Sequence, residues 1–448
     1  MQDVFDHIDA NQDRYLALLQ RLVRQRSVAA QNIGMVETAR MVEELLAAQG
    51  FAVQQYPTGG HPVVYAERPG SSGKRLSFYN HYDVQPAEPL DLWTGDAWSG
   101  EIRDGRIWGR GVADNKGNLA ARIAAMDAVL AMRGDLPLGV KFIVEGEEEI
   151  GSVNLTDFTE AYPELCAADA CIWEFGGKDW EGRPLLHLGL KGICYVELRA
   201  RGANTDLHSA LGTTVPNPAW RLTWALASLK GPDERVRIPG FYDRVRPPSA
   251  ADLAAVELLP DEAARRLVHL GIDQHLLGLA GTELKARDVF EPTCTISGLL
   301  SGYTDAGSKT VLPARAIAKV DMRLVPDQDP HEIFVLLRAH LDANGFEDID
   351  IESFGPGYPA RTPIDAPIAR VVAETHAYLT GKEAVLVPTS AGSGPWRQVC
   401  GVYGIDACTA GVGHPGSNAH APDENIFVED YIQGIKHIAM IMDRFARL

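Results

Sequence analysis

The pair His81 and Asp83 is the first place where residue types and spacing could support chemistry. The two residues follow an apolar run, Leu76–Asn80, that is typical of a buried β-strand. Because they are two positions apart on an extended chain, their side chains point the same way. A carboxylate beside a histidine ring commonly orients an imidazole that binds a metal ion. The pair therefore predicts a histidine metal ligand with a carboxylate partner.

An acidic run at residues 145–149, with the sequence EGEEE, directly follows the apolar strand-like residues 141–144. Adjacent carboxylates repel one another, which costs stability unless cations neutralise them. A solvated acidic loop is the alternative interpretation, and Glu147 in particular is expected to be solvated. The run therefore indicates either an exposed loop or a cation site at the end of a strand.

Two single carboxylates and a late histidine complete the set of candidate ligands. Asp114 stands among glycines just before a helix-like run, where it could instead cap that helix. Glu174 follows another strand-like run, and a buried carboxylate without a partner is costly. His420 lies in a Gly-rich loop, residues 413–424, with too little apolar content to be core. Histidine and carboxylate ligands without cysteine suit Zn²⁺, Mn²⁺ or Co²⁺.

Taken together, these segments resemble the M20 family of metallopeptidases and deacylases, and its dipeptidase-like (carnosinase-like) branch in particular. The resemblance covers nearly the whole chain and rests on four motifs in the family's order: HYD at 81–83, GRGVADNKG at 109–117, EGEEEIGS at 145–152 and SNAHAPDENI at 417–426. It implies two divalent metal ions per subunit, with Zn²⁺ expected first and Mn²⁺ or Co²⁺ as alternatives.

The resemblance also implies a role for each candidate. The implied metal ligands are His81 and Glu174 for one ion and Glu149 and His420 for the other, with Asp114 bridging both; the implied catalytic residues are Glu148 as general base and Asp83 as the partner that orients His81. The peptide bond after Asp114 would be cis. Two divalent ions outweigh three carboxylate ligands by about one positive charge, which favours an activated water and an anionic transition state.

A second set of residues resembles the family's substrate-binding groups. Arg323 would bind a substrate carboxylate through its bidentate guanidinium, with Thr310 adding a hydrogen bond to the same group. His208 would reach into the partner subunit's site in a homodimer and polarise the scissile carbonyl. Without the resemblance, His208 would be interpreted as an exposed loop histidine and Arg323 as part of an ordinary salt bridge.

The chain departs from the family's pattern at residues 389–395, TSAGSGP. Dipeptidases of the family often carry an arginine and a Gly-Gly-Ser-Ile-Pro run there, whereas this chain has Thr389 and an altered run. Gly392 and Ser393 remain as expected backbone and hydroxyl contacts to the substrate, and Arg361 is a candidate for the missing positive charge. The departure leaves hydrolysis expected and the substrate open.

The elements that must position these residues alternate between strand-like and helix-like patterns over residues 1–190. This alternation favours an α/β fold with a mostly parallel sheet flanked by helices. Residues 191–359 are predicted to form an inserted α+β domain with an antiparallel sheet, which the resemblance identifies as a lid and dimerisation domain. Within it, residues 232–291 are expected to be a partly helical elaboration. Residues 360–448 complete the di-metal catalytic domain.

Composition narrows the classes of protein to which the chain can belong. Its 448 residues are 46% hydrophobic and 23% charged, which is ordinary for a globular protein. The net charge of −18 argues against nucleic acid or an anionic membrane as a partner. No apolar stretch approaches the roughly 20 residues of a membrane helix. The N-terminus lacks a signal-like apolar run, and the cysteines lack CxxC spacing, so we expect a cytoplasmic protein with reduced thiols.

The sequence therefore predicts metal-dependent hydrolysis of a peptide bond in dipeptides or short peptides by a metal-activated water. An N-acyl-amino-acid deacylase, of the acetylornithine or succinyl-diaminopimelate type, is the alternative, because it would share every metal residue. A non-catalytic metal-binding protein is a third interpretation. Glu148 argues against it, since a general base has no evident structural use.

Overall fold

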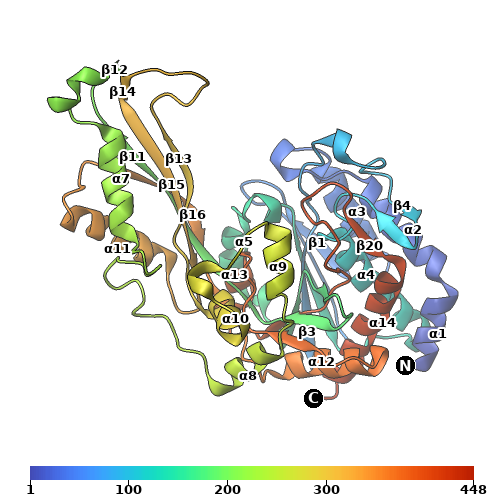
Figure 1. The fold of residues 1–448 in the computed structure, drawn as a ribbon. Coiled ribbons are helices and arrows are strands. Elements are labelled where there is room, and N and C mark those ends of the chain that lie inside the picture. The colour runs from blue at the N-terminus through green and yellow to red at the C-terminus, as the bar shows by residue number, and fades with distance from the viewer.

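A computed structural model describes residues 1–448, except for the side chain of His269. The chain forms a larger α/β part and a smaller part built on a long antiparallel sheet that projects from it (Figure 1). The predicted fold class, a mostly parallel sheet flanked by helices with an inserted antiparallel domain, is confirmed.

The larger part is organised around a six-stranded sheet with the order β1-β2-β6-β3-β7-β19. The β3–β6, β3–β7 and β7–β19 pairs are parallel, and the β1–β2 and β2–β6 pairs are antiparallel. Every residue of β6 is buried, as expected for a strand that is covered on both faces. The strands are β1 Ala52–Tyr56, β2 Val63–Arg68, β3 Arg75–His81, β6 Gly139–Glu145, β7 Ala170–Trp173 and β19 Ala407–Thr409.

Helices cover this sheet and form most of the core with it. The Ala-rich helix α4 packs against both α2 and α14, because its small side chains allow a close approach. The helices of this part are α1 Gln2–Ala10, α2 Gln12–Arg24, α3 Met35–Ala47, α4 Lys116–Arg133, α5 Leu155–Ala161, α6 Pro163–Cys166, α12 Pro367–Thr380, α13 Trp396–Val399 and α14 Val428–Phe445. None of the helices described combines the length and apolarity that crossing a membrane requires.

Two small three-stranded sheets extend the larger part. One has the order β20-β5-β4 and joins the C-terminal segment to the residues before α4, while the other has the order β18-β9-β8. Their strands are β4 Glu101–Arg103, β5 Arg106–Trp108, β20 Asn425–Phe427, β8 Gly177–Lys178, β9 Pro184–His187 and β18 Val385–Val387.

The smaller part is a four-stranded antiparallel sheet with the order β13-β15-β11-β16. Helices α7 and α11 pack on it around a separate apolar core. Asn217 and Asp329 cap these two helices, each directly before a proline in the first turn, as the sequence signals predict. The bounds are β11 Gly192–Arg201, β13 Thr295–Ser301, β15 Arg315–Leu324, β16 Asp350–Gly357, α7 Pro218–Leu229 and α11 Pro330–Ala343.

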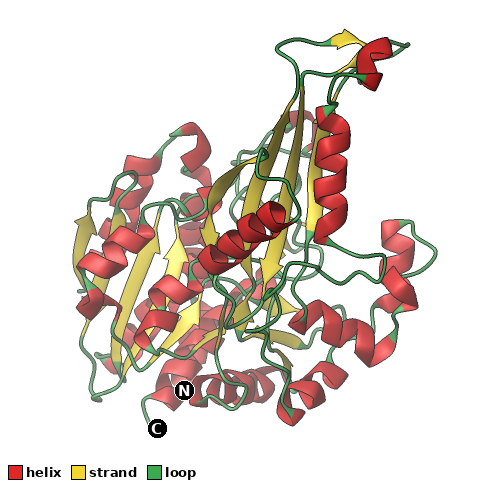
Figure 2. Cartoon of the chain, turned by 90° about the vertical axis from the view of Figure 1, so that its left-hand side faces the viewer, coloured by secondary structure: helices red, strands yellow, loops and turns green.

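The far end of the smaller part is a narrow tip (Figure 2). Two short strands, β12 (Leu207–His208) and β14 (Val311–Leu312), pair there, with His208 opposite Val311. Since β15 has ten residues, it spans about 30 Å between this tip and the larger part.

The expected elaboration consists of three helices, α8 Ala250–Leu258, α9 Ala263–Leu270 and α10 Gly281–Phe290. Although these helices lie between strands of the smaller sheet in the sequence, α8 contacts β18 of the larger part. The chain enters and leaves the smaller part through two paired strands, β10 (Gly189–Leu190) and β17 (Ala360–Arg361). We propose that this pair marks the boundary between two domains. Residues 1–190 and 360–448 form one domain, and residues 191–359 form the other.

Candidate metal centre

The carboxyl ends of adjacent parallel strands carry most of the candidate ligands. β3 ends at His81, a single turn with Glu148 and Glu149 follows β6, and Glu174 follows β7. Because β3 lies between β6 and β7 and all three are parallel, these ends meet at the same edge of the sheet. The fold therefore gathers residues that are up to 93 positions apart in the sequence.

Asp114, just before α4, is the centre of the cluster. Its Oδ1 lies 3.0 Å from Nε2 of His81, and its Oδ2 lies 3.1 Å from Nε2 of His420. Each histidine faces a second carboxylate at 3.1 Å, Glu174 Oε2 for His81 and Glu149 Oε2 for His420. The structure thus brings together all the residues expected to bind metal, as two histidine–carboxylate pairs that share Asp114. The Asp114–Asn115 peptide bond is cis.

The electrostatics of the cluster suits cations. Hydrogen bonds to Asp114 and Glu149 raise the pKa of His420 to about 10. Burial would lower the pKa of His81, but hydrogen bonds to Asp114 and to its other carboxylate neighbours raise it well above its ordinary value. Burial would likewise raise the pKa of Asp114, yet the hydrogen bonds from the two histidines hold it below its ordinary value. A divalent cation can take the place of the proton that each pair shares.

The donor set itself tests whether metal ions fit. Ligand atoms of His81, Asp114 and Glu149 lie within 4.8 Å of one another. Glu149 Oε1 is buried and has no hydrogen-bond partner among the described residues, which is costly for a carboxylate oxygen unless a cation is near. Imidazole nitrogen and carboxylate oxygen are ligands that Zn²⁺ and similar ions accept. The residues present therefore fit a pair of divalent cations.

Asp83 is fully buried behind His81. Its Oδ1 lies 3.3 Å from Nδ1 of His81, and its backbone oxygen lies 3.0 Å from the same nitrogen. The Asp83 carboxylate also accepts hydrogen bonds from the backbone N–H groups of Glu148 and Glu149, at 3.3 and 3.0 Å. One carboxylate therefore fixes the His81 ring and the turn that carries two further site residues.

Glu148 lines a cavity of about 400 Å³ beside the cluster. The cavity is also lined by Gln85, Asp114, Glu149, Glu174, Phe175, Leu190, Ser390, Gly392, Ser393 and His420. Arg323, from the smaller part, donates a hydrogen bond of 2.8 Å to the hydroxyl of Ser393. Gly392 and Ser393 thus line the cavity that contains Asp114, and Arg323 contacts it only through Ser393.

His208 and Thr310 lie away from this cavity. Both are exposed residues at the tip of the smaller part, where the backbone N–H of Ser209 donates a hydrogen bond to the backbone oxygen of Thr310. Arg323 lies near the opposite end of β15, so the length of that strand separates it from Thr310. Within one chain, the structure does not bring the two tip residues to the candidate ligands.

Two expectations need correction. Arg361 does not supply a free positive charge to the cavity, because it is largely buried and its guanidinium lies 3.3 Å from the Asp252 carboxylate of α8. Glu147 is buried rather than solvated, since it accepts hydrogen bonds from the His61 backbone and the Asn154 side chain. The Arg361–Asp252 and His61–Glu147 contacts join residues that are 109 and 86 positions apart in the sequence.

Sequence reasoning missed Glu424, which holds the Asp114 loop in place. This fully buried carboxylate lies 2.7 Å from Nη1 of Arg110 and accepts hydrogen bonds from the backbone N–H groups of Gly111, Ala113 and Asp114. Burial raises the pKa of Glu424 to about 7. Its place in the SNAHAPDENI motif was the only available signal.

Arg122 was missed as well, although an arginine within an Ala-rich apolar helix is an unusual feature. It is fully buried in α4 and donates hydrogen bonds to the Tyr79 carbonyl and the Asn80 side chain, each at 2.6 Å. It also donates to the backbone oxygens of Trp173 and Glu174. The guanidinium therefore ties together the ends of β3 and β7 that carry His81 and Glu174.

Replacing Glu424 with Gln should lower the free energy of unfolding by about 3–5 kcal/mol, because Arg110 would lose its buried partner and an amide NH₂ would face backbone donors. Metal affinity should fall as well, since the Asp114 loop loses its anchor. Urea unfolding in EDTA measures the first effect, and competition with a chelator measures the second. Glu429→Gln, at an exposed position in α14, should change stability by less than about 0.5 kcal/mol. Equal effects in the two variants would contradict the role of Glu424.

Comparison with known proteins finds peptidases. Residues 77–444 match a family described as peptidase family M20/M25/M40. The beta-Ala-His dipeptidase of Rattus norvegicus is 28% identical over 369 residues, which cover 77% of this chain and 74% of that protein. The Cys-Gly metallodipeptidase dug1 of Schizosaccharomyces pombe is 29% identical over 371 residues, which cover 76% and 75%. The solved structure of an M20 family metallo-carboxypeptidase from Sulfolobus solfataricus is 38% identical with a TM-score of 0.92, covering 97% of this chain and 99% of that one.

Proposed function

Because the chain belongs to peptidase family M20/M25/M40, we propose that it hydrolyses the peptide bond of dipeptides or short peptides. Two divalent metal ions would take part in the reaction, and Zn²⁺ is the first candidate for both. The observation that carries the proposal is the sharing of Asp114 between two histidine–carboxylate pairs, at a cavity that Glu148 also lines. The similar proteins named as dipeptidases and as a metallo-carboxypeptidase support the same class of reaction.

When bound, the two cations supply Lewis-acid chemistry, activating a water and polarising the scissile carbonyl. The chain's own residues handle the proton. Without cations, burial and the charge of Glu174 raise the pKa of Glu148 well above its ordinary value. Two bound divalent cations would lower it again, which leaves the carboxylate ionised and able to accept a proton. Glu148 takes a proton from the attacking water and donates it to the leaving nitrogen as the C–N bond breaks. The products are a free carboxylate and an amine.

Arg323 and Ser393 offer a binding site for the carboxylate end of the substrate. The Ser393 hydroxyl lies at the wall of the cavity, and the Arg323 guanidinium donates a hydrogen bond to it. A guanidinium binds a carboxylate through two parallel hydrogen bonds, which favours substrates with a free C-terminus.

Replacing Arg323 with Met should raise KM for a dipeptide about 10–100-fold, because a hydrogen bond to a charged group contributes about 1.5–3 kcal/mol. The same dipeptide with an amidated C-terminus should show little change, since it offers no carboxylate. Steady-state kinetics on both substrates measures the difference. Arg315→Met, at the exposed opposite end of β15, is the matched control. Equal losses on both substrates would exclude carboxylate recognition by Arg323.

The exposed tip residues fit a homodimer in which each chain completes the partner's site. His208 and Thr310 lie together at the tip, distant along β15 from Arg323 of their own chain. In a dimer formed through the smaller part, the tip of one chain would reach the other chain's cavity. There His208 would donate a hydrogen bond to the substrate's scissile carbonyl, and Thr310 to its carboxylate.

Complementation tests this arrangement. His208→Ala and Glu148→Gln should each be inactive alone, but their co-expressed mixture should regain about one quarter of the parent activity, because random pairing restores one site in each mixed dimer. Activity assays on mixtures, with light scattering to confirm the dimer, give the result. Mixed dimers that stay inactive would show that His208 does not act across the subunit interface.

The reaction itself is tested on a mixed panel of dipeptides, N-acetyl amino acids and N-succinyl amino acids, with EDTA and with added Zn²⁺ or Mn²⁺. Metal-dependent cleavage of dipeptides is expected, and EDTA should abolish it. Cleavage confined to the acylated amino acids would instead assign the chain as a deacylase. No cleavage of any substrate by protein that holds two metal ions would contradict the proposal.

A further inference from the structure

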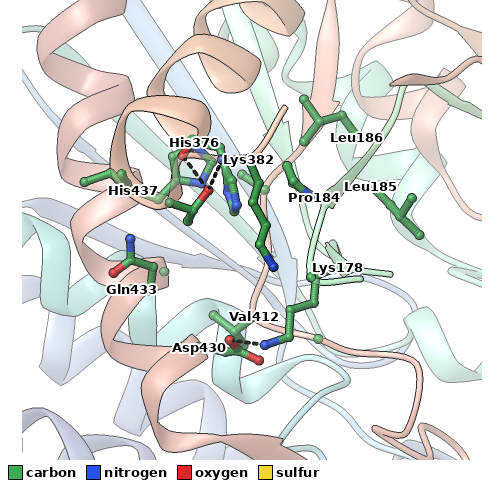
Figure 3. A pocket seen from close by; sticks show the side chains of 18 of the residues that line it. Lys178, Pro184, Leu185, Leu186, His376, Lys382, Val412, Asp430, Gln433 and His437 are labelled. Carbon is green, nitrogen blue, oxygen red and sulfur yellow. Dashed lines mark hydrogen bonds and ion pairs between the residues drawn. The ribbon is translucent and has the colours of Figure 1, made fainter. Parts of the chain in front are cut away.

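A second cavity, of about 380 Å³, lies between β8 and β9 on one side and α12 and α14 on the other (Figure 3). Its walls come from β8 and β9, the end of α12, the start of α14 and residues 410–413. None of the residues that line it also lines the cavity beside Asp114. Its volume is many times the roughly 30 Å³ that one water occupies, so it has room for a small molecule.

Two lysines and a histidine are among the residues that line this pocket. Figure 3 shows Lys382, Lys178 and His376 reaching toward it from the turn after α12, from β8 and from α12. Lys178 is neutralised by Asp430, with 2.6 Å between Nζ and Oδ1, and the other oxygen of Asp430 is buried away from solvent. Lys382 Nζ donates to the Glu181 carbonyl at 2.6 Å, and no described carboxylate lies within 4.0 Å of it. Its charge is therefore the uncompensated one.

The pKa of His376 reflects the positive charges of the nearby lysines. Burial, followed by the charges of Lys178 and Lys382, lowers the pKa of His376 to about 4. The ring is therefore neutral at pH 7 and can act as a hydrogen-bond donor to an anion. Glu429, the remaining acidic residue of the lining, is exposed at the start of α14.

Apolar side chains form part of the wall of this pocket. Leu186 and Val412 are buried, and Leu379 is partly buried beside His376 in α12. A bare inorganic ion would leave this apolar surface uncovered, whereas a short hydrocarbon chain would cover it.

We propose that this pocket binds a small organic anion, whose carboxylate or phosphate group pairs with Lys382 beside Lys178 and His376 and whose apolar part lies against Leu186, Leu379 and Val412. Lys382 is an exposed residue whose side chain lines the pocket, and an anion there would offset its uncompensated charge through a charge-assisted hydrogen bond.

The test is nuclear magnetic resonance of the histidine rings in the metal-loaded protein, with the His376 signal assigned from a His376→Gln variant. Butyrate, butyl phosphate and 1-butanol serve as probes with the same apolar body and different heads. At pH 7, where the metal ions stay bound and both acidic head groups are ionised, at least one anion should shift the His376 signal saturably, because it pairs with Lys382 beside the ring. Uncharged 1-butanol should give no saturable shift.

Matched lysine variants locate the site. Lys382→Met should weaken binding of the responding anion about tenfold or more, whereas Lys436→Met, at a lysine of α14 that pairs with Asp9, should leave it unchanged. A response to butyrate alone identifies a carboxylate ligand, and a response to butyl phosphate alone identifies a phosphate ligand. The proposal is overturned if neither anion moves the His376 signal, if 1-butanol moves that signal as much, or if Lys382→Met binds as tightly as the parent.

Discussion

Replacing Glu148 with Gln is expected to lower kcat about 10²–10⁴-fold while two metal ions stay bound, because the amide cannot accept a proton from the attacking water. KM should change little, since Glu148 is not among the groups expected to hold the substrate. Gln has nearly the same shape as Glu, so the cavity wall is preserved. Steady-state kinetics and elemental metal analysis on the same preparation give both quantities.

The neighbouring residue supplies the control for this prediction. Glu147 is also a buried glutamate, but its carboxylate accepts hydrogen bonds from His61 and Asn154 and does not line the cavity. Glu147→Gln should cost about 1–3 kcal/mol of stability and leave kcat of the folded protein nearly unchanged. If Glu148→Gln hydrolyses substrate as fast as the parent, Glu148 is not the general base.

Replacing Asp114 with Asn is expected to reduce bound metal from two ions per chain to fewer than one and to lower activity at least about 10³-fold. Asp114 is the carboxylate that faces both histidines, at 3.0 and 3.1 Å. An amide is neutral, and its NH₂ group would repel a cation on one side. Elemental analysis after dialysis against a weak chelator, together with kinetics, measures both losses.

Asp127→Asn is the matched control, because Asp127 lies further along α4, the helix that follows Asp114. Its carboxylate accepts hydrogen bonds from Arg14 and Tyr15, at 2.6 and 2.9 Å. This variant should keep two metal ions and nearly full activity. Retention of both ions by Asp114→Asn would refute a centre built around Asp114.

The sequence was informative where short-range patterns decide the structure. The apolar run before His81 predicted β3, and Asn217 and Asp329 marked the starts of α7 and α11, since each such signal depends only on neighbouring residues. The ends of strands carried the candidate ligands, and parallel pairing then brought them together. The resemblance to the M20 family is confirmed by the match over residues 77–444.

Contacts between segments that are distant in the sequence could not be predicted from the sequence. Glu424 pairs with Arg110 across 314 positions, and Arg361 pairs with Asp252 of a helix that had no assigned place. Glu147 could not be distinguished from its solvated alternative, because one of its partners, the His61 backbone, is 86 positions away in the sequence. In each case the buried partner, rather than the residue's own neighbours, decides whether a charge is exposed or neutralised.

The most direct test of the account is anomalous X-ray scattering at the zinc absorption edge, on crystals of the Zn²⁺-loaded protein. Two anomalous peaks are expected beside Asp114, one next to His81 and Glu174 and the other next to His420 and Glu149. The absence of peaks at Asp114, or zinc bound only elsewhere on the chain, would contradict it.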